Sequence, residues 1–262
     1  MKQATRRTLV YGTLALPAAL VGAAGFLYAE AMYAVHRGLP TVTGHDPSGE
    51  VGDPAHPEVT LLLLGDSTLT GSGLESVDDI WVRQMAARLS GEFRIRIVSV
   101  ATGGARTAEV RRDQLPRALR TRADLAIVST GANDVMHVTP LREIERDLTA
   151  IVAELHAVAP EVLLTGVGDL GNVPRVPFPL TLVASARSRS VDRIHRRVAE
   201  RFDYADKVPV GAMTARFSRD RSLFGPDWFH PSRAGHAIWA DAATPVVRSA
   251  LERVVRQRRA HA

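Results

Sequence analysis

The chain of 262 residues contains no cysteine. This absence excludes a disulfide framework, thiolate metal sites, iron–sulfur clusters and a cysteine nucleophile. Aromatic residues are also few, at 5%, although hydrophobic residues as a whole make up 45% of the chain. An apolar fraction of that size is ordinary for a folded protein, so a largely disordered chain is excluded as well.

Two common motifs of metal-binding and phosphate-binding sites are missing too. The sequence has no H-E-x-x-H pair of histidines and no phosphate loop with Gly-Lys-Ser/Thr. The formal net charge is only +5, from 33 Lys and Arg against 28 Asp and Glu, and no nucleic-acid recognition motif accompanies it. We therefore expect no metal, no organic cofactor and no nucleic-acid partner.

The first 35 residues are predicted to be a membrane anchor or signal segment. Basic residues at positions 2, 6 and 7 precede a stretch without charge from Thr8 to Ala29, which is long enough for the ~20 residues of a spanning helix. An uncleaved anchor and a cleaved signal peptide both fit, because Ala29-Glu30-Ala31 offers a small-x-small cleavage site. The arginine pair leaves both general and twin-arginine export open. In either case the basic flank stays inside, so we expect an extracytoplasmic domain, anchored or secreted.

The rest of the chain divides into a linker over 36–58 and a folded domain over 59–262. The linker is rich in Pro, Gly, Asp and Thr and has no apolar period. The domain alternates apolar runs with helical patterns, which predicts a three-layer α/β/α sandwich with a mostly parallel sheet. The strands are expected at 59–64, 95–100, 125–128, 162–165 and, more weakly, 204–210; the helices at 80–89, 144–155, 191–202 and from about Ser232 onward.

Glycines and polar residues follow three of these strands, where an α/β sheet collects its functional groups. Ser67, in Gly65-Asp66-Ser67, is exposed at the sheet edge and can act as a nucleophile. Gly104, in Gly103-Gly104, lets backbone N–H groups approach a substrate, and the Asn133 amide can donate to a developing oxyanion. Each pattern alone is equally typical of a turn or a helix cap.

A possible acid–base pair stands near the C-terminus, in Asp227-Trp228-Phe229-His230. A histidine with an ordinary pKa can take a serine proton near neutral pH. A carboxylate three residues earlier, in a loop, can fold back and orient the imidazole. With nine histidines in the chain, one near an aspartate is unremarkable by itself.

The four patterns in this order resemble the SGNH (GDSL-type) serine esterase/lipase superfamily. The resemblance covers nearly all of 59–262 and implies a flavodoxin-like fold with a five-stranded parallel sheet. It implies that Ser67 is the nucleophile, with Asp227 and His230 as its catalytic partners. The backbone N–H groups of Ser67 and Gly104 and the Asn133 amide then form the oxyanion hole.

Two positions depart from the family pattern. Thr68 replaces the usual leucine after the serine, which leaves the nucleophile intact. Ser99 stands where many relatives carry an asparagine before the second block, which puts a supporting hydrogen bond in doubt.

The resemblance implies hydrolysis of carboxylic esters through an acyl-enzyme, with no cofactor. Lipid esters and O-acyl groups on carbohydrate both fit as substrates. The proline-rich loop 170–180, with Trp228 and Phe229, either walls the acyl site or is an ordinary connector. Two alternatives remain open: an acyltransferase that uses the same acyl-enzyme, and a non-catalytic envelope binding protein on the same fold.

Overall fold

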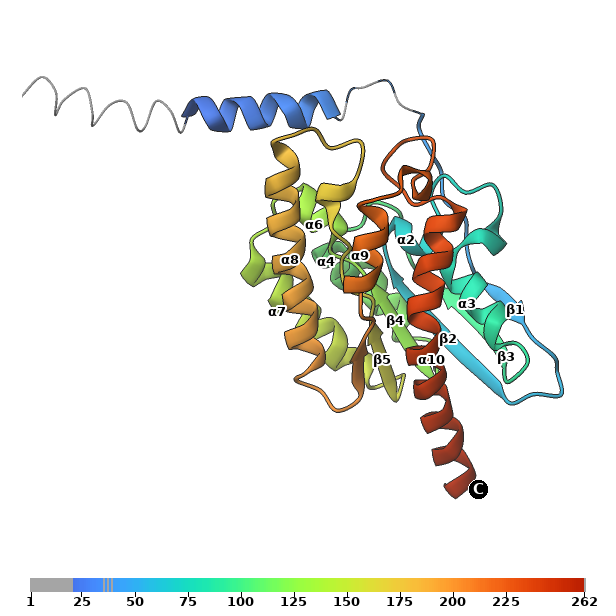
Figure 1. Cartoon of the computed structure of the whole chain (residues 1–262). Helices are drawn as coiled ribbons and strands as arrows, with labels where there is room; N and C mark the ends of the chain where they lie inside the picture. Colours follow the sequence, from blue (N-terminus) through green and yellow to red (C-terminus); the bar gives the residue numbers. More distant parts are fainter. Residues whose placement is uncertain (1–20, 35, 37, 39, 262) are drawn as a thin grey trace, which may run out of the picture.

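The computed structural model describes residues 21–34, 36, 38 and 40–261, and its folded domain is a sheet between two layers of helices (Figure 1). The six strands lie in the order β1-β3-β2-β4-β5-β6. All neighbouring pairs are parallel except β1 with β3. The strands are β1 (Gly49–Val51), β2 (Glu58–Gly65), β3 (Arg94–Ser99), β4 (Leu125–Ser129), β5 (Glu161–Leu164) and β6 (Ala205–Lys207).

Four long helices cover the sheet. The helices α3 (Trp81–Leu89) and α10 (Arg233–His261) pack on one face, and α7 (Leu141–Leu155) and α8 (Leu180–Ala199) pack on the other (Figure 1). The shorter helices are α2 (Ser67–Thr70), α4 (Thr107–Glu109), α5 (Leu115–Ala118), α6 (Ala132–Met136) and α9 (Gly211–Phe217). Short helical turns form η1 (Val77–Asp79), η2 (Val110–Gln114), η3 (Leu170–Asn172) and η4 (Arg221–Leu223).

The leucines of β2 supply both cores. Side chains alternate along a strand, so Leu61 and Leu63 pack with α3 and α10, while Leu62 and Leu64 pack with α7 and α8. All four are fully buried, and burying one such side chain contributes about 1.5–3 kcal/mol. The prediction of a buried parallel strand here is confirmed, and the fold class with it.

The sheet has one strand more than the five expected. The extra strand, β1, lies inside the segment 36–58 that we predicted to be a linker, and it pairs antiparallel with β3, with Gly49 opposite Ile97. Its three residues are exposed or half-buried, so they carry no apolar pattern. The strand forms because its backbone pairs with the open edge of β3. A search for apolar periodicity in the sequence cannot detect such a strand.

The helix α8 begins at Leu180, well before the helix predicted over 191–202. The prediction placed the start too late because the apolar period begins only at Val191. In the first half of α8 the side chains that face the core are the small Ala184 and Ser188. Small residues give a weak periodic signal, although they allow close packing against the turn η3.

The N-terminal part of the described chain is helical over 21–34 and lies along one end of the domain, beside the start of α8 (Figure 1). No helix within the described residues is both long enough and apolar enough to cross a membrane. Residues 8–20 of the predicted membrane segment lie outside the described residues. The anchor and the signal peptide both stay predictions.

His195 is buried in the middle of α8, facing the end of β4. Its side chain has no exposed surface, and neither ring nitrogen has a hydrogen-bond partner among the described residues. Burial lowers its pKa to about 4, with Asp192 acting in the opposite direction and Lys207 in the same direction. The imidazole is therefore neutral in the folded protein at neutral pH.

We expect His195 to make the protein less stable in mild acid. The unfolded chain binds a proton near pH 6.5 but the folded chain only near pH 4, so stability is lost as the pH falls through this window. The shift corresponds to about 3 kcal/mol. Denaturant unfolding at pH 7 and pH 4 measures it, with His195→Leu alongside. Equal losses of stability in the two proteins would contradict the assignment.

Candidate active site

The predicted site residues come together at the carboxyl edge of the parallel strands. Ser67 follows β2 and begins α2, and Gly104 lies in the loop after β3. Asn133 lies in α6 after β4, and His230 lies in the loop before α10. All four line one cavity, as expected from the shared edge.

Gly65 sets the position of Ser67. Its φ is +152°, and a Cβ at this position would lie 1.9 Å from the carbonyl oxygen of Ser129 on β4. The next residue, Asp66, donates its backbone N–H to that same oxygen at 3.0 Å. Only glycine permits this approach, so the chain leaves β2 at the point where Ser67 reaches the edge of the sheet.

Asp66 caps the short helix α2, with Ser67 as the first residue. Its Oδ1 accepts from the N–H of Thr68 at 3.0 Å and from the Thr68 hydroxyl at 2.9 Å. Burial raises the pKa of Asp66 to about 6, although these hydrogen bonds counteract it. The threonine that replaces the family's leucine thus strengthens the cap that holds the serine.

Ser67, His230 and Asp227 form one chain of hydrogen bonds. His230 Nε2 lies 3.1 Å from Ser67 Oγ, and His230 Nδ1 lies 2.7 Å from Asp227 Oδ2. An ionised carboxylate can only accept, so Nδ1 carries the proton and Nε2 is free to accept from the serine hydroxyl. The three predicted partners are therefore in contact, from two loops that are far apart in sequence.

Asp227 is held rigidly and in its charged form. Its Oδ1 accepts from the backbone N–H groups of Phe229 and His230, both at 3.0 Å. Burial by itself raises the pKa of Asp227, but the hydrogen bonds from the His230 ring and from these two amides outweigh it, so the pKa lies below its ordinary value. A buried, ionised carboxylate stabilises a protonated imidazole next to it.

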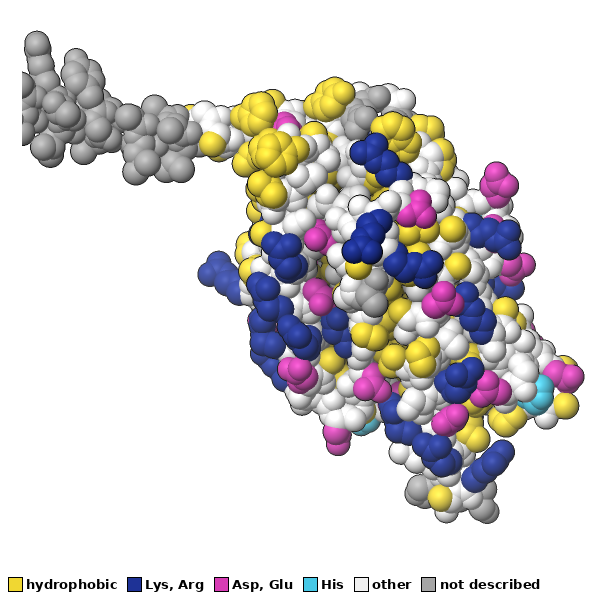
Figure 2. Space-filling model, in the orientation of Figure 1, with side chains coloured by type: hydrophobic (Ala, Val, Ile, Leu, Met, Phe, Trp, Pro, Cys, Tyr) yellow, Lys and Arg dark blue, Asp and Glu magenta, His cyan; other side chains and the backbone are white. Residues whose placement is uncertain are grey.

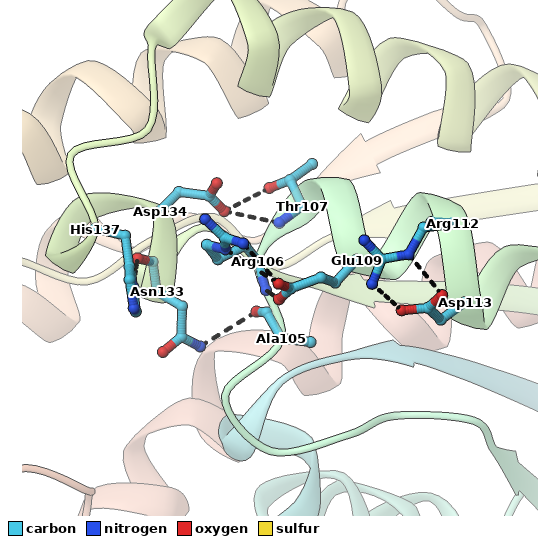
Figure 3. Close-up of polar contacts among 9 residues, drawn as sticks. All are labelled: Ala105, Arg106, Thr107, Glu109, Arg112, Asp113, Asn133, Asp134 and His137. Carbon is cyan, nitrogen blue, oxygen red and sulfur yellow. Dashed lines mark hydrogen bonds and ion pairs between the residues drawn. The ribbon is translucent and has the colours of Figure 1, made fainter.

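The loop that carries Gly104 is tied to α6, which carries Asn133. Figure 3 shows the bonds of Asn133 and Asp134 to Ala105 and Thr107. The Asn133 amide donates to the carbonyl of Ala105 at 3.2 Å. Buried Asp134 accepts from both the N–H and the hydroxyl of Thr107, each at 2.8 Å. These bonds fix the loop after β3 against α6. Gly104 itself has φ of +79° and no atom within 4 Å of a Cβ position, so its backbone is open to the cavity.

Ser99 supplies a local bond at the position where the family carries asparagine. Its Oγ accepts from the backbone N–H of Ala101 at 3.3 Å, and its own N–H donates to Ser48 Oγ at 3.0 Å. The turn after β3 is therefore supported partly from residue 48, in the predicted linker.

Two hollows meet at Ser67 and His230. One is an apolar pocket of about 100 Å³. The other is an open, polar cavity of about 550 Å³. The apolar pocket is lined chiefly by Leu170, Val173, Met213, Phe217, Phe224 and Trp239, and Phe229 lines both hollows.

The loop 170–180 therefore contributes to a wall of the site through Leu170 and Val173. Trp228, which we grouped with Phe229, lines a separate hollow with Pro174 and Arg221. Met213 and Phe217 of α9 were not anticipated, because nothing in a short helical run marks which residues face a pocket.

The predicted linker supplies residues of the polar cavity that sequence reasoning missed: Val42, Gly44 and His45. The N–H of His45 donates to the carbonyl of Thr70 at 2.6 Å, and its Nε2 donates to the carbonyl of Leu74 at 2.8 Å. This leaves Nδ1 of His45 as an acceptor. No signal in the sequence distinguished these residues from other polar linker residues.

No group of His, Cys, Asp or Glu side chains within residues 21–34 and 40–261 is arranged to hold a metal ion. The loop after β5 has the spacing G-x-G-x-x-G from Gly166 to Gly171, but it does not open a long helix as a dinucleotide fingerprint does. Instead Gly171 packs against α8, where a Cβ would lie 1.9 Å from Ser185 Oγ.

A parallel sheet with a serine, a histidine and an aspartate in one hydrogen-bonded chain at its carboxyl edge has the geometry of an α/β serine hydrolase. Residues 63–238 match the GDSL-like lipase/acylhydrolase family, and the chain belongs to that family. The resemblance inferred from the four motifs is thus confirmed.

Individual relatives agree with this assignment. A GDSL-like esterase of Mycobacterium tuberculosis is 28% identical over 200 residues, which cover 74% of this chain but only 63% of the relative. The structure of TesA has a TM-score of 0.61 at 21% identity, covering 73% of this chain and 99% of that one. A carbohydrate acetylesterase family member from Sinorhizobium meliloti has a TM-score of 0.56 at 18% identity, covering 74% and 99%. At these identities the structures show the shared fold.

We expect Gly65→Ala to destabilise the protein strongly. The new methyl group would clash with the Ser129 carbonyl, so β2 and β4 must separate at the site. The expected loss is at least about 2 kcal/mol in the free energy of unfolding. Gly91→Ala is the matched control, since a Cβ there has no neighbour within 4 Å. Thermal unfolding compares the two, and a Gly65→Ala protein as stable as Gly91→Ala would refute the packing argument.

Proposed function

We propose that the protein hydrolyses carboxylic esters, with Ser67 as nucleophile and His230 as general base. The observation that carries this proposal is the unbroken chain from Ser67 Oγ through His230 to Asp227, with distances of 3.1 and 2.7 Å. Both distances are within the range that proton transfer requires. Membership of the GDSL-like lipase/acylhydrolase family supports the same reaction class.

The reaction begins when Ser67 Oγ attacks the ester carbonyl carbon and His230 Nε2 takes the hydroxyl proton. The carbonyl oxygen becomes an oxyanion. His230 then returns the proton to the alcohol oxygen as the ester bond breaks, which leaves an acyl group on Ser67. A water molecule then attacks the acyl carbon while His230 takes its proton. His230 returns this proton to Ser67 Oγ as the acyl–serine bond breaks, which releases the acid and restores the serine. Asp227 keeps the imidazole in one tautomer and stabilises its protonated form throughout.

The oxyanion would be held by the backbone N–H groups of Ser67 and Gly104 and by the Asn133 amide. All three residues line the polar cavity, and Gly104 presents its backbone without a side chain. The bond from Asn133 to the Ala105 carbonyl uses one of the two amide hydrogens, so the other remains for substrate. One such donor typically contributes ~2.7–4 kcal/mol of transition-state stabilisation.

The two hollows suggest how a substrate is placed. The apolar pocket suits the acyl chain, and at about 100 Å³ it is smaller than the ~300–1,000 Å³ of pockets that hold drug-sized ligands. We therefore infer a short acyl group. The polar cavity, with Thr70, Ser72 and His45 on its walls, suits the alcohol part of the ester. The carbohydrate acetylesterase family member among the similar structures is consistent with a polyhydroxyl alcohol.

The size of the polar cavity also bears on the acyltransferase alternative. At about 550 Å³ it has room for an acceptor alcohol in place of water, and both reactions share the acyl-enzyme. Hydrolysis in the presence of a polyol, with analysis of the products, distinguishes the two: a transferase forms the new ester, and a hydrolase releases only acid.

We further propose that the domain lies outside the cytoplasm, held by the N-terminal segment or released from it. The support is the order of basic residues and then an uncharged stretch from Thr8 to Ala29. Recovery of the chain in the membrane fraction or in the medium separates the anchored form from the secreted one, and recovery in the cytoplasm contradicts both.

We expect Ser67→Ala to abolish hydrolysis of p-nitrophenyl acetate and butyrate, with a fall in kcat of about 10⁴-fold or more. Ser190→Ala is the matched control, because the Ser190 hydroxyl bonds only within its own helix. Circular dichroism confirms that both proteins are folded. Retention of full activity by a folded Ser67→Ala protein would exclude the serine mechanism.

Val173→Phe should narrow the range of acyl chains. Val173 is buried in the wall of the apolar pocket, and a larger side chain there takes up the space of several methylene groups. We expect kcat/KM for p-nitrophenyl butyrate to fall about tenfold or more, while the value for the acetate stays nearly unchanged. The reason is that one methylene group in an apolar pocket contributes about 1–3 kcal/mol of transition-state binding. An equal fall for both esters would mean that the acyl chain lies elsewhere.

A further inference from the structure

An apolar surface lies at the edge of the domain that carries the site. Phe178 is 74% exposed and Leu182 is 61% exposed. Phe178 lies in the segment that joins η3 to α8, and Leu182 lies in the first turn of α8. Figure 2 shows hydrophobic side chains gathered at this end of the molecule, next to the helix over 21–34. We call the exposed side chains of Phe178, Leu182 and Val183, with Phe26 and Tyr28 of that helix, the apolar rim.

The helix over 21–34 is attached to the domain through the same segment. Arg175 Nε donates to the carbonyl of Ala34 at 2.7 Å, and the Leu180 N–H donates to the Glu30 carboxylate at 3.2 Å. Ala34 is buried. These contacts place both parts of the apolar rim beside each other, within the loop system that also carries Leu170 and Val173 of the apolar pocket.

The chain that leads into the rim is itself compatible with lipid. The sequence from Thr8 to Ala29 has no charged residue and follows a basic flank, which is the composition of a segment surrounded by lipid. Large contiguous apolar surfaces are rare on soluble proteins and mark interaction sites. A lipid surface accounts for the rim and for the preceding sequence together, whereas a protein partner accounts only for the rim.

Positive charge lies close to the loop 170–180, which leads into the rim. Arg219 precedes η4 and Arg221 is its first residue; both are exposed, and neither forms an ion pair with another described residue. Arg221 shares a small hollow with Pro174 and Trp228, which connects this charge to the loop 170–180. Exposed cations beside apolar and aromatic side chains favour the headgroup region of a membrane with anionic lipids.

We propose that the apolar rim docks on a lipid bilayer, so that the carboxyl edge of the sheet faces the membrane. The apolar pocket then opens beside the lipid interface, and esters located at that interface reach Ser67 without crossing the aqueous phase. This goes beyond the hydrolysis proposed above and does not depend on which ester is cleaved, because the rim belongs to the surface and not to the catalytic groups.

The lack of cysteine allows a direct test in the full chain. Phe178→Cys carries one environment-sensitive fluorophore, and Ala55→Cys, exposed in the turn at the opposite edge of the sheet, is the matched control. Both are mixed with vesicles of equimolar phosphatidylcholine and phosphatidylglycerol that contain doxyl-labelled lipid. We expect a blue shift and about twofold quenching at position 178, as for a group ~5–10 Å below the headgroups, and neither effect at position 55.

The same label at Leu182→Cys repeats the measurement in case one substitution disturbs the loop, and circular dichroism reports that the labelled proteins are folded. The chain could float with the vesicles while aqueous iodide quenches the labels at 178 and 182 as strongly as the label at 55. In that case the apolar rim does not contact the bilayer and the proposal is overturned, although the membrane anchor and the esterase activity are unaffected. If the full chain does not float with the vesicles, the proposal is also overturned. Esterase activity is measured separately, so its absence bears only on the proposed function.

Discussion

The close approach of β2 and β4 at Gly65 and Ser129 is the constraint on which the site depends. The carbonyl of Ser129 occupies the space of a side chain on Gly65 and accepts from the N–H of Asp66. The chain must therefore turn sharply at the end of β2. Asp66 then caps α2, and Ser67 emerges at the edge of the sheet. Backbone contacts between two central strands position the nucleophile, which makes its place as rigid as the core itself.

The rest of the site depends on ties between loops from different strands. Asp134 bonds to Thr107 through two hydrogen bonds, and Asn133 bonds to Ala105, so α6 and the loop after β3 move as one unit. Asp227 uses its second oxygen to hold the backbone on which His230 is placed. Donors that are fixed before substrate arrives need no reorganisation during the reaction, and such preorganisation is usually the largest contribution to catalysis.

The sequence predicts those parts of the molecule whose residues are compatible with one environment only. The continuous apolar run of β2 is compatible only with a central strand. The motifs with Ser67, Gly104 and Asn133 follow strands, and the Asp227–His230 pair lies in the loop before the last helix. Prediction failed where the backbone or small residues decide the structure. The strand β1 forms by edge pairing, the first half of α8 packs through Ala184 and Ser188, and neither leaves an apolar period. His45 reaches the polar cavity only through tertiary contacts.

The segment before the family's shared region forms part of the walls of the site, while the reactive groups lie within that region. The groups proposed for bond making and breaking lie within residues 63–238, which the family shares. Val42, Gly44 and His45, on the wall of the polar cavity, precede that region, as does the helix over 21–34 that contacts the loop 170–180. The segment before the shared region thus borders the polar cavity, where we propose that the alcohol part of the ester binds, and it also carries part of the apolar rim. Substitutions in this segment can therefore change a wall of the polar cavity, while the contacts among Ser67, His230 and Asp227 stay in place.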